Sequence, residues 1–168
     1  MTVVRRAARV ALFRKDALFD LSLDHRATAD AALLVSGVAA AGYLGNVLAG
    51  RGFSLRFLVS VVINSVTLWI VMAGLTFLVA KLVCPSQAPM TTIMRLQGFC
   101  YLPLLVTTLF PDSVLASASR IWFLAVLVFA TAEALETAYS RAAMVVGGSL
   151  VGLFLIGQLL WGRWLFLG

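Results

Sequence analysis

Two carboxylates near the end of an apolar segment are the clearest candidates for chemistry in this sequence. Glu133 and Glu136 lie three positions apart, and on one continuous helix this spacing would direct both side chains to the same side. Such a pair could bind a cation or relay a proton. Because a carboxylate inside a bilayer is costly unless it is paired or hydrated, the alternative is a salt-bridge network at the membrane rim with Arg141 and with Arg95, which we place on an adjacent loop.

Three amide side chains fall in different apolar segments, at similar distances from the same end of the predicted bundle. They are Asn46, Asn64 and Gln158. Counting about 1.5 Å per helical residue places all three within roughly 6 to 11 Å of one membrane surface, so they could meet. Buried amides between membrane helices usually hold those helices together, and the alternative is a polar substrate pocket.

The other reactive residue types form no catalytic pattern. His25 is the only histidine and lies outside every apolar segment, which argues against haem or chlorophyll ligated by histidine from this chain. Cys84 and Cys100 have no metal-ligand spacing, so we expect both to pack as small apolar residues. Because we find neither a nucleophile, base and acid set nor a nucleotide motif, the sequence predicts a protein that is not an enzyme and carries no cofactor or metal.

The segments that carry these residues are typical of a membrane protein. Hydrophobic residues make up 62% of the 168 positions, and the mean hydropathy is +1.02, which is too apolar for a soluble domain of this size. A bilayer offers no water to backbone amides, so apolar runs of about 20 residues must form helices. The predicted fold is therefore all-α, a bundle of five transmembrane helices with an N-terminal amphipathic helix.

The five predicted spans form a transmembrane domain over residues 31–168, and the third span is the weakest. They cover approximately residues 31–50, 57–80, 96–110, 121–139 and 142–162. The third is near the lower length limit and has Pro103 in its middle, so we expect it to be kinked, tilted or extended on the inner side. Gly148 and Gly152 in the last span predict a close helix contact, either internal or between protomers.

Half of the charged side chains lie in residues 1–30, a basic arm that precedes the first span. Residues 3–21 can form an amphipathic helix that lies on the membrane surface or docks onto the inner face of the protein. The formal net charge is +6, but the cations form no stripe with interleaved aromatics, so anionic lipid headgroups rather than nucleic acid are the predicted partner.

The distribution of cations also predicts an orientation. Placing the N-terminus inside leaves most arginines and lysines on inner segments, as the positive-inside rule requires. Trp122, Trp161 and Trp164 then fall at the outer interface, where tryptophan is enriched. The sequence thus predicts a cytoplasmic N-terminus and an outside C-terminus.

Two short segments carry a resemblance to a known family. Residues 94–103 read MRLQGFCYLP and open the third span, and residues 136–142 read ETAYSRA and join the last two spans. With the five-span, N-inside layout, they make residues 19–158 resemble the Yip family of small membrane proteins. The resemblance implies a helical scaffold without catalysis that associates with itself or with other membrane proteins. Eukaryotic members have a long cytosolic N-terminal region that helps engage GTPases, and the short arm here resembles bacterial relatives in the cytoplasmic membrane.

The predicted function is therefore that of a non-enzymatic integral membrane scaffold or adaptor of Yip type, acting through contacts with lipids and with other membrane proteins. One alternative is an accessory subunit of a larger energy-converting or transport complex. Another is a small carrier that uses the glutamate pair or the three amides.

Overall fold

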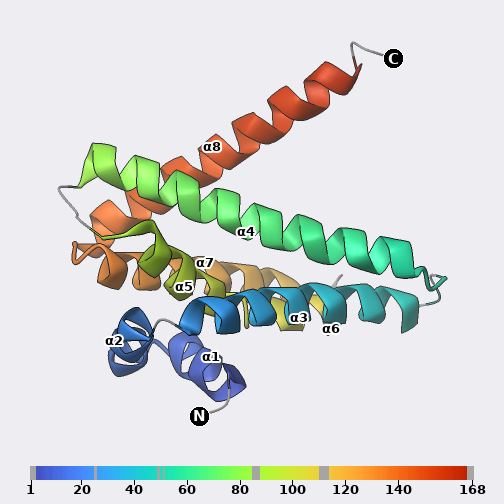
Figure 1. Ribbon diagram of the computed structural model, residues 1–168, viewed down its shortest axis with the longest axis horizontal. Helices are drawn as coiled ribbons and strands as arrows, with labels where there is room; N and C mark the ends of the chain where they lie inside the picture. Colours follow the sequence, from blue (N-terminus) through green and yellow to red (C-terminus); the bar gives the residue numbers. More distant parts are fainter. Residues whose placement is uncertain are drawn as a thin grey trace.

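The computed structural model contains eight helices in the residues that it describes, which are 3–24, 26–48, 50, 52–84, 88–109 and 114–165. No strand occurs among them. The helices are α1 (Val3–Ala11), α2 (Lys15–Leu23), α3 (Ala27–Leu48), α4 (Leu55–Val83), α5 (Met90–Phe99), α6 (Leu104–Leu109), α7 (Val114–Ala134) and α8 (Tyr139–Leu165). Figure 1 shows α3 and α4 running antiparallel along the length of the molecule, with α1 and α2 beneath one end.

Four helices in the described part of the chain are long and apolar enough to cross a membrane. They are α3, α4, α7 and the first 20 residues of α8, Tyr139–Gln158. Their mean hydropathies, measured over the most apolar 18-residue windows, range from 1.6 to 2.1, as expected for segments that face lipid. The chain is thus an all-helical protein built around four helices of membrane-spanning character.

The predicted third span consists of two short helices, α5 and α6, separated by a break at residues 100–103. Neither helix alone has the length that a bilayer requires. Pro103 lies at the break, where the sequence predicts a kink, because proline has no N–H for a helical hydrogen bond. The pair nevertheless follows α3 closely, since α3 contacts both α5 and α6.

The predicted single amphipathic helix over residues 3–21 is wrong. The structure has two helices, α1 and α2, and between them Phe13 has a φ of 56°, in the left-handed region that few non-glycine residues adopt. The apolar faces of both helices are buried, and they pack against α5 and α7, while α1 also contacts α3. Of the two arrangements considered for this segment, the structure shows docking onto the protein. We call α1 and α2 together the arm.

The predicted boundaries of the last two spans also need correction. The fourth predicted span covered residues 121–139, but α7 is Val114–Ala134 and ends five residues earlier. Residues 135–138 form a turn, in which Glu136 has a φ of 49°. The helix therefore stops between the two glutamates, and α8 begins at Tyr139.

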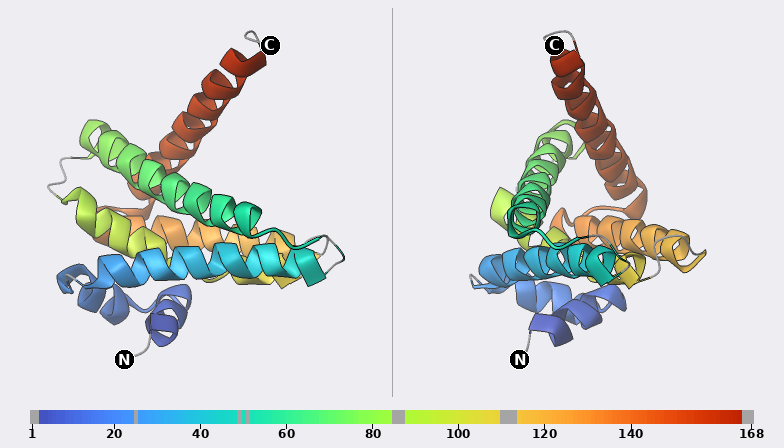
Figure 2. Two further views of the ribbon diagram at one scale, coloured as in Figure 1. Left: turned by 45° about the vertical axis from the view of Figure 1, so that its right-hand side comes forward. Right: turned by 90° about the vertical axis from the view of Figure 1, so that its right-hand side faces the viewer.

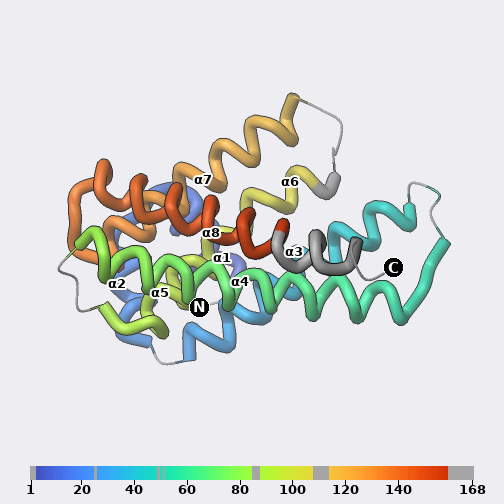
Figure 3. The backbone as a smooth tube through the Cα atoms, turned by 90° about the horizontal axis from the view of Figure 1, so that it is seen from above, coloured from blue at the N-terminus to red at the C-terminus, as the bar shows by residue number. Residues whose placement is uncertain are grey.

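The two ends of the bundle differ in how closely the helices approach one another. One end of the bundle contains the arm, the start of α5 and residues 135–138, and we call it the arm end. The opposite end contains residues 52–54 and α6, and we call it the loop end. Viewed from above, α6 and the start of α7 diverge from α3 and α4 toward the loop end (Figure 3). Helix α8 also leaves the bundle, with its C-terminal half rising away from the other helices (Figure 2).

Candidate functional site

The interface between the arm and the bundle contains a mixed polar and apolar cavity of about 750 Å³. Its walls come from α2, the start of α5, and the end of α7 with the following turn. Among its lining residues are Lys15, Ser22, Thr92, Glu133 and Glu136. Two of the four charged residues singled out in the sequence, Glu133 and Glu136, line this cavity, whereas Arg95 and Arg141 do not.

Glu133 is held by a residue of the arm. The Nζ atom of Lys15 lies 2.7 Å from Oε1 of Glu133, and the hydrogen bond to this carboxylate, together with its charge, raises the pKa of Lys15. No local pattern in the sequence pairs these residues, because more than one hundred positions separate them. The ion pair therefore ties α2 to the last turn of α7.

Glu136 does not share a helix with Glu133. Because α7 ends at Ala134 and Glu136 lies in the turn with a positive φ, the three-residue spacing no longer directs both carboxylates to one side. The Glu136 side chain is exposed, whereas that of Glu133 is partly buried. Both residues line the cavity, but the prediction of a parallel pair on one helix is wrong.

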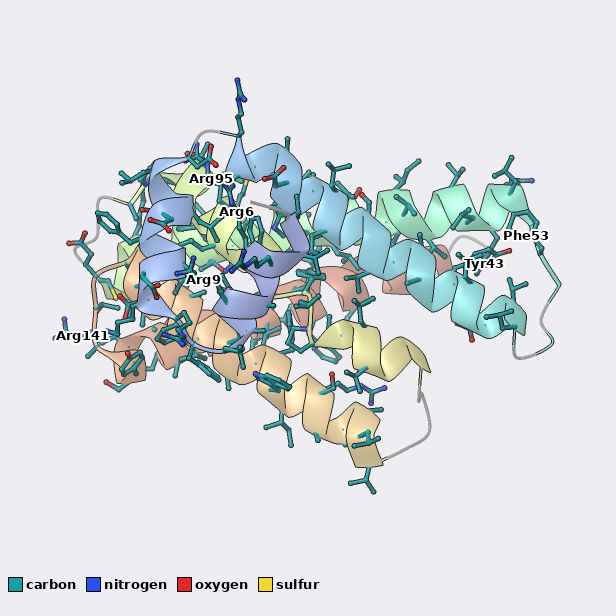
Figure 4. The ribbon with its side chains drawn as sticks, turned by 90° about the horizontal axis from the view of Figure 1, so that it is seen from below. Arg6, Arg9, Tyr43, Phe53, Arg95 and Arg141 are labelled. Atoms are coloured by element: carbon teal, nitrogen blue, oxygen red, sulfur yellow. The ribbon has the colours of Figure 1, made fainter. Side chains whose placement is uncertain are left out.

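Arg95 lies inside the protein instead of on a loop. It belongs to α5, is 7% exposed, and donates from Nε to Oγ1 of Thr28 at 2.8 Å and from Nη1 to the carbonyl oxygen of Ser22 at 3.1 Å. A guanidinium group can bind several acceptors at once, so Arg95 fastens the end of α2 and the start of α3 to α5. Arg141, by contrast, is exposed in the first turn of α8 and points away from the bundle (Figure 4).

Ion pairs also stabilise the arm internally and at its connection to α3. Nη1 of Arg6 lies 2.7 Å from Asp24 and 3.4 Å from Asp30, and Arg9 pairs with Asp16 across the turn between α1 and α2. The hydrogen bond from Arg6 lowers the pKa of Asp24. Arg6 and Arg9 are thus paired with carboxylates of the same chain. Arg5, Arg14 and Arg26 are exposed.

Aromatic contacts complete the docking of the arm. The rings of Phe13 and Phe129 meet edge to face with centroids 5.3 Å apart, and Nε1 of Trp122 donates to the carbonyl oxygen of Ala11 at 2.9 Å. Trp122 lies two turns inside α7 and contacts the end of α1, and its place at the outer interface stays a prediction. The side chains of Trp161 and Trp164, and His25, lie outside the described residues.

The structure does not bring the three predicted amides together. Asn46, Asn64 and Gln158 are all exposed, on three different helices. The Nδ2 atom of Asn46 donates to the carbonyl oxygen of Gly42 in its own helix at 2.9 Å. Gln158 lies six residues beyond Gly152, where α8 contacts α4.

Gly148 and Gly152 face α4 within the same chain. A Cβ added to Gly148 would lie 3.2 Å from Val79, and one added to Gly152 would lie 3.5 Å from Leu75. The small-residue spacing thus forms an internal helix contact, which resolves the choice that the sequence left open. It joins the first half of α8 to α4.

Among the glycines of the described residues, Gly98 makes the closest contact with a neighbouring helix, and no pattern in the sequence singled it out as a packing residue. A Cβ at this position would lie only 2.6 Å from that of Ala31. Next to it, Nε1 of Trp69 donates to the carbonyl oxygen of Met94 at 3.1 Å, and Nε2 of Gln97 donates to Oγ1 of Thr76 at 2.9 Å. Helix α5 is therefore held between α3 and α4 by one close approach and two hydrogen bonds, inside the segment that carries the family resemblance.

Both cysteines are buried and free. Cys100 donates weakly to the carbonyl oxygens of Leu96 and Val126, and Sγ of Cys84 lies 3.9 Å from Oγ1 of Thr137. No group of histidine, cysteine, aspartate and glutamate side chains in the described part of the chain could hold a metal ion.

Comparison of the chain with protein-family models, with curated proteins and with solved structures finds no match.

Proposed function

We propose that this protein is a non-enzymatic integral membrane scaffold or adaptor of Yip type that binds other membrane proteins through α8. The observation that carries the proposal is the divergence of this helix from its own bundle (Figures 1 and 2). Its first half packs onto α4, through Gly148 and Gly152. Val151, Phe154 and Leu155, which lie between and just after these glycines, are 55 to 64% exposed.

A transmembrane helix that packs on its own chain for only half its length has an apolar face that lipid or another helix must cover. Lipid alone can cover such a face, but packing against a second helix adds close van der Waals contact that lipid chains supply less well. The arm end provides the rigid base for this arrangement, because the arm, α5 and α7 are joined there by hydrogen bonds and an ion pair. The proposed partners are other membrane proteins or a second copy of the chain.

The proposed topology has five passes, with α5 and α6 forming a broken third span. Together they cover residues 90–109, about 30 Å at roughly 1.5 Å per residue if fully helical, and they follow α3. The N-terminus is proposed to be cytoplasmic and the C-terminus outside, in a bacterial cytoplasmic membrane, in agreement with the positive-inside rule. In this orientation the exposed Arg5, Arg14 and Arg26 lie on the side of the anionic lipid headgroups.

Association is tested by measuring the particle mass in mild detergent and by cross-linking in native membranes. The unmodified chain should run as an assembly larger than its own 18.0 kDa. Phe154→Ala combined with Leu155→Ala should reduce it to a single chain, whereas Leu33→Ala combined with Leu44→Ala, on the exposed face of α3, should not. A single chain at every concentration, with no cross-linked partner in the membrane, would contradict the scaffold proposal.

Orientation is tested with single cysteines at exposed positions of the two ends, in a chain whose two native cysteines are replaced by alanine. Phe53→Cys at the loop end should react with a membrane-impermeant maleimide in intact cells. Asp20→Cys in α2 should react only after the cells are permeabilised. The opposite pattern would invert the proposed topology without affecting the association proposal.

A further inference from the structure

A second cavity, of about 570 Å³, opens at the loop end, away from the arm. Its walls are the C-terminal half of α3, the N-terminal half of α4, and α6 with the residues before it. Most of its lining is apolar or small, and includes Val35, Val38, Ala39, Gly42, Val61 and Leu104. The polar residues among its lining, Asn46, Ser54, Ser65 and Thr107, come from all three walls.

The break in the third span explains why this cavity exists. Helix α5 ends at Phe99, and Pro103 lies directly before α6. Helix α6 packs on α3 and α7, and it diverges from α4 toward the loop end (Figure 3). Small residues on α3, Ala39 and Gly42, have side chains too short to fill the space that this leaves. At the arm end the same side of the α3 and α4 pair is filled by α5, with Gly98 against Ala31.

The rim of the cavity at the loop end is fixed by Tyr43. Its hydroxyl group donates to the carbonyl oxygen of Ser54 at 3.0 Å, which joins α3 to the residue that caps α4. Its ring lies 5.6 Å from that of Phe57 and 6.0 Å from that of Phe53, between centroids. Figure 4 shows Tyr43 and Phe53 together at this end, remote from the arginines of the arm. Aromatic and polar groups thus gather at this end of the helices, a composition typical of helix ends at a membrane surface.

The length and chemistry of the cavity match one lipid chain. Its lining runs from Val35 to Asn46 on α3 and from Ser54 to Ser65 on α4, about 16 Å on each helix at roughly 1.5 Å per residue. One leaflet of a hydrocarbon core about 30 Å thick measures about 15 Å. The volume lies within the range of roughly 300 to 1,000 Å³ that is common for small-molecule sites, which are mostly apolar with a few polar groups.

We propose that this cavity is a binding site for a single acyl chain of a membrane phospholipid. The chain lies between α3, α4 and α6, and the ester region of the lipid lies at the rim beside Asn46 and Ser54. The site is separate from the proposed association face of α8, because none of the α8 side chains that the structure describes, including Phe154 and Leu155, is among its lining. It also gives a role to the broken third span, since an unbroken helix beside α3 would occupy the same space.

The experiment uses a matched pair of serines on α4. Ser65 lines the cavity, whereas Ser60 is exposed outside it. The full chain is reconstituted in vesicles of phosphatidylethanolamine and phosphatidylglycerol that contain a phosphatidylethanolamine with a diazirine in one acyl chain. The protein is extracted with mild detergent and then irradiated, and mass spectrometry measures the cross-linked lipid. The unmodified chain and Ser60→Leu should each retain one cross-linked lipid per chain. Ser65→Leu, which fills the cavity, should keep about tenfold less.

A second measurement does not depend on how the variants fold. In the unmodified chain, the cross-links should map to Tyr101 and Leu104 on the far wall of the cavity. Cross-links only at exposed positions such as Leu33 and Ile63, or equal retention in Ser65→Leu and Ser60→Leu, would show ordinary surrounding lipid and overturn the proposal. Ala39→Leu, on the opposite wall, should repeat the effect of Ser65→Leu.

Discussion

The arm end and the loop end are built from similar apolar helices but are held together differently. At the arm end, Arg95, Gln97 and Trp69 each donate a hydrogen bond to a different helix or segment, and Gly98 lets α3 and α5 touch. At the loop end, Tyr43 joins α3 to Ser54, and Ser119 of α7 donates to the carbonyl oxygen of Pro103, while a cavity separates α6 from α4.

The difference shows what fixes helix positions in a chain this apolar. Lipid tails are as apolar as leucine, so apolar side chains alone do not select one neighbour over another in a bilayer. Close backbone approach and buried hydrogen bonds do select neighbours, and both are concentrated at the arm end. The loop end has few of them between α6 and α4, which leaves the cavity of the proposed lipid site there.

The largest expected effect comes from disturbing the closest packing at the arm end. Gly98→Ala places a Cβ 2.6 Å from that of Ala31 and 3.3 Å from Trp69, which should lower the free energy of unfolding by about 2 to 3 kcal/mol. Gly37→Ala is the matched control on α3, where no atom lies within 4 Å. It should instead stabilise the helix by about 0.5 to 1 kcal/mol. Thermal unfolding in detergent, followed by circular dichroism, measures both, and equal melting temperatures would refute tight packing at the arm end.

Two buried threonines should respond differently to the same substitution. Thr76 is fully buried and accepts the hydrogen bond from Nε2 of Gln97, so Thr76→Val should destabilise the fold by about 1 kcal/mol. Oγ1 of Thr131 is buried and has no hydrogen-bond partner, so Thr131→Val should be neutral or stabilising by up to about 1 kcal/mol. Thermal unfolding in detergent, followed by circular dichroism, measures the change in stability of both variants. A loss of stability in Thr131→Val would show that its hydroxyl group has a partner.

The ion pair between the arm and α7 should have a smaller, local effect. Glu133→Gln removes the partner of Lys15, and hydrogen exchange in α1 and α2 should become about two- to fivefold faster, as expected for a partly exposed ion pair. Glu136→Gln is the matched control, because this carboxylate is exposed in the turn, and it should leave exchange unchanged. The exchange of α6 should not respond to either variant. Equal changes in both variants would mean that overall charge, not the ion pair, holds the arm.

The sequence was a good guide where a pattern depends on hydropathy alone. The apolar runs predicted α3, α4 and α8 to within a few residues, because a bilayer allows those runs only one backbone structure. The proline at position 103 also indicated the break between α5 and α6. Such local patterns can be recognised in the sequence without knowing which helices pack against one another.

The candidate site was predicted less well because its contacts are distant in sequence. The helical pattern over residues 3–21, which only Arg14 interrupts, did not reveal the turn at Phe13. The apolar run left the end of the fourth span open between Ala132 and Tyr139, and α7 ends at Ala134. Arg95 was placed on a loop because a charge at the edge of an apolar run usually lies in water. Its acceptors, the hydroxyl of Thr28 and the carbonyl of Ser22, come from a segment about seventy positions earlier, and no local pattern indicates such a partner.

The smallest expected effect is the pH dependence of arm docking. The pKa of Asp24 is lowered below its ordinary value of 3.8, so its pairing with Arg6 stabilises the docked arm above that pH and is lost as the pH falls through the lowered value. The pKa of Lys15 is raised above 10.5, so its pairing with Glu133 is present below that pH and is lost as the pH rises through the raised value. Nitroxides at Asp20→Cys and Arg141→Cys should therefore keep one separation between these two ordinary pKa values and move apart only below 3.8 and above 10.5. A control pair at Phe53→Cys and Val114→Cys, at the loop end, should not respond to these titrations. A change of the first pair near neutral pH would show that groups other than Asp24 and Lys15 control the arm.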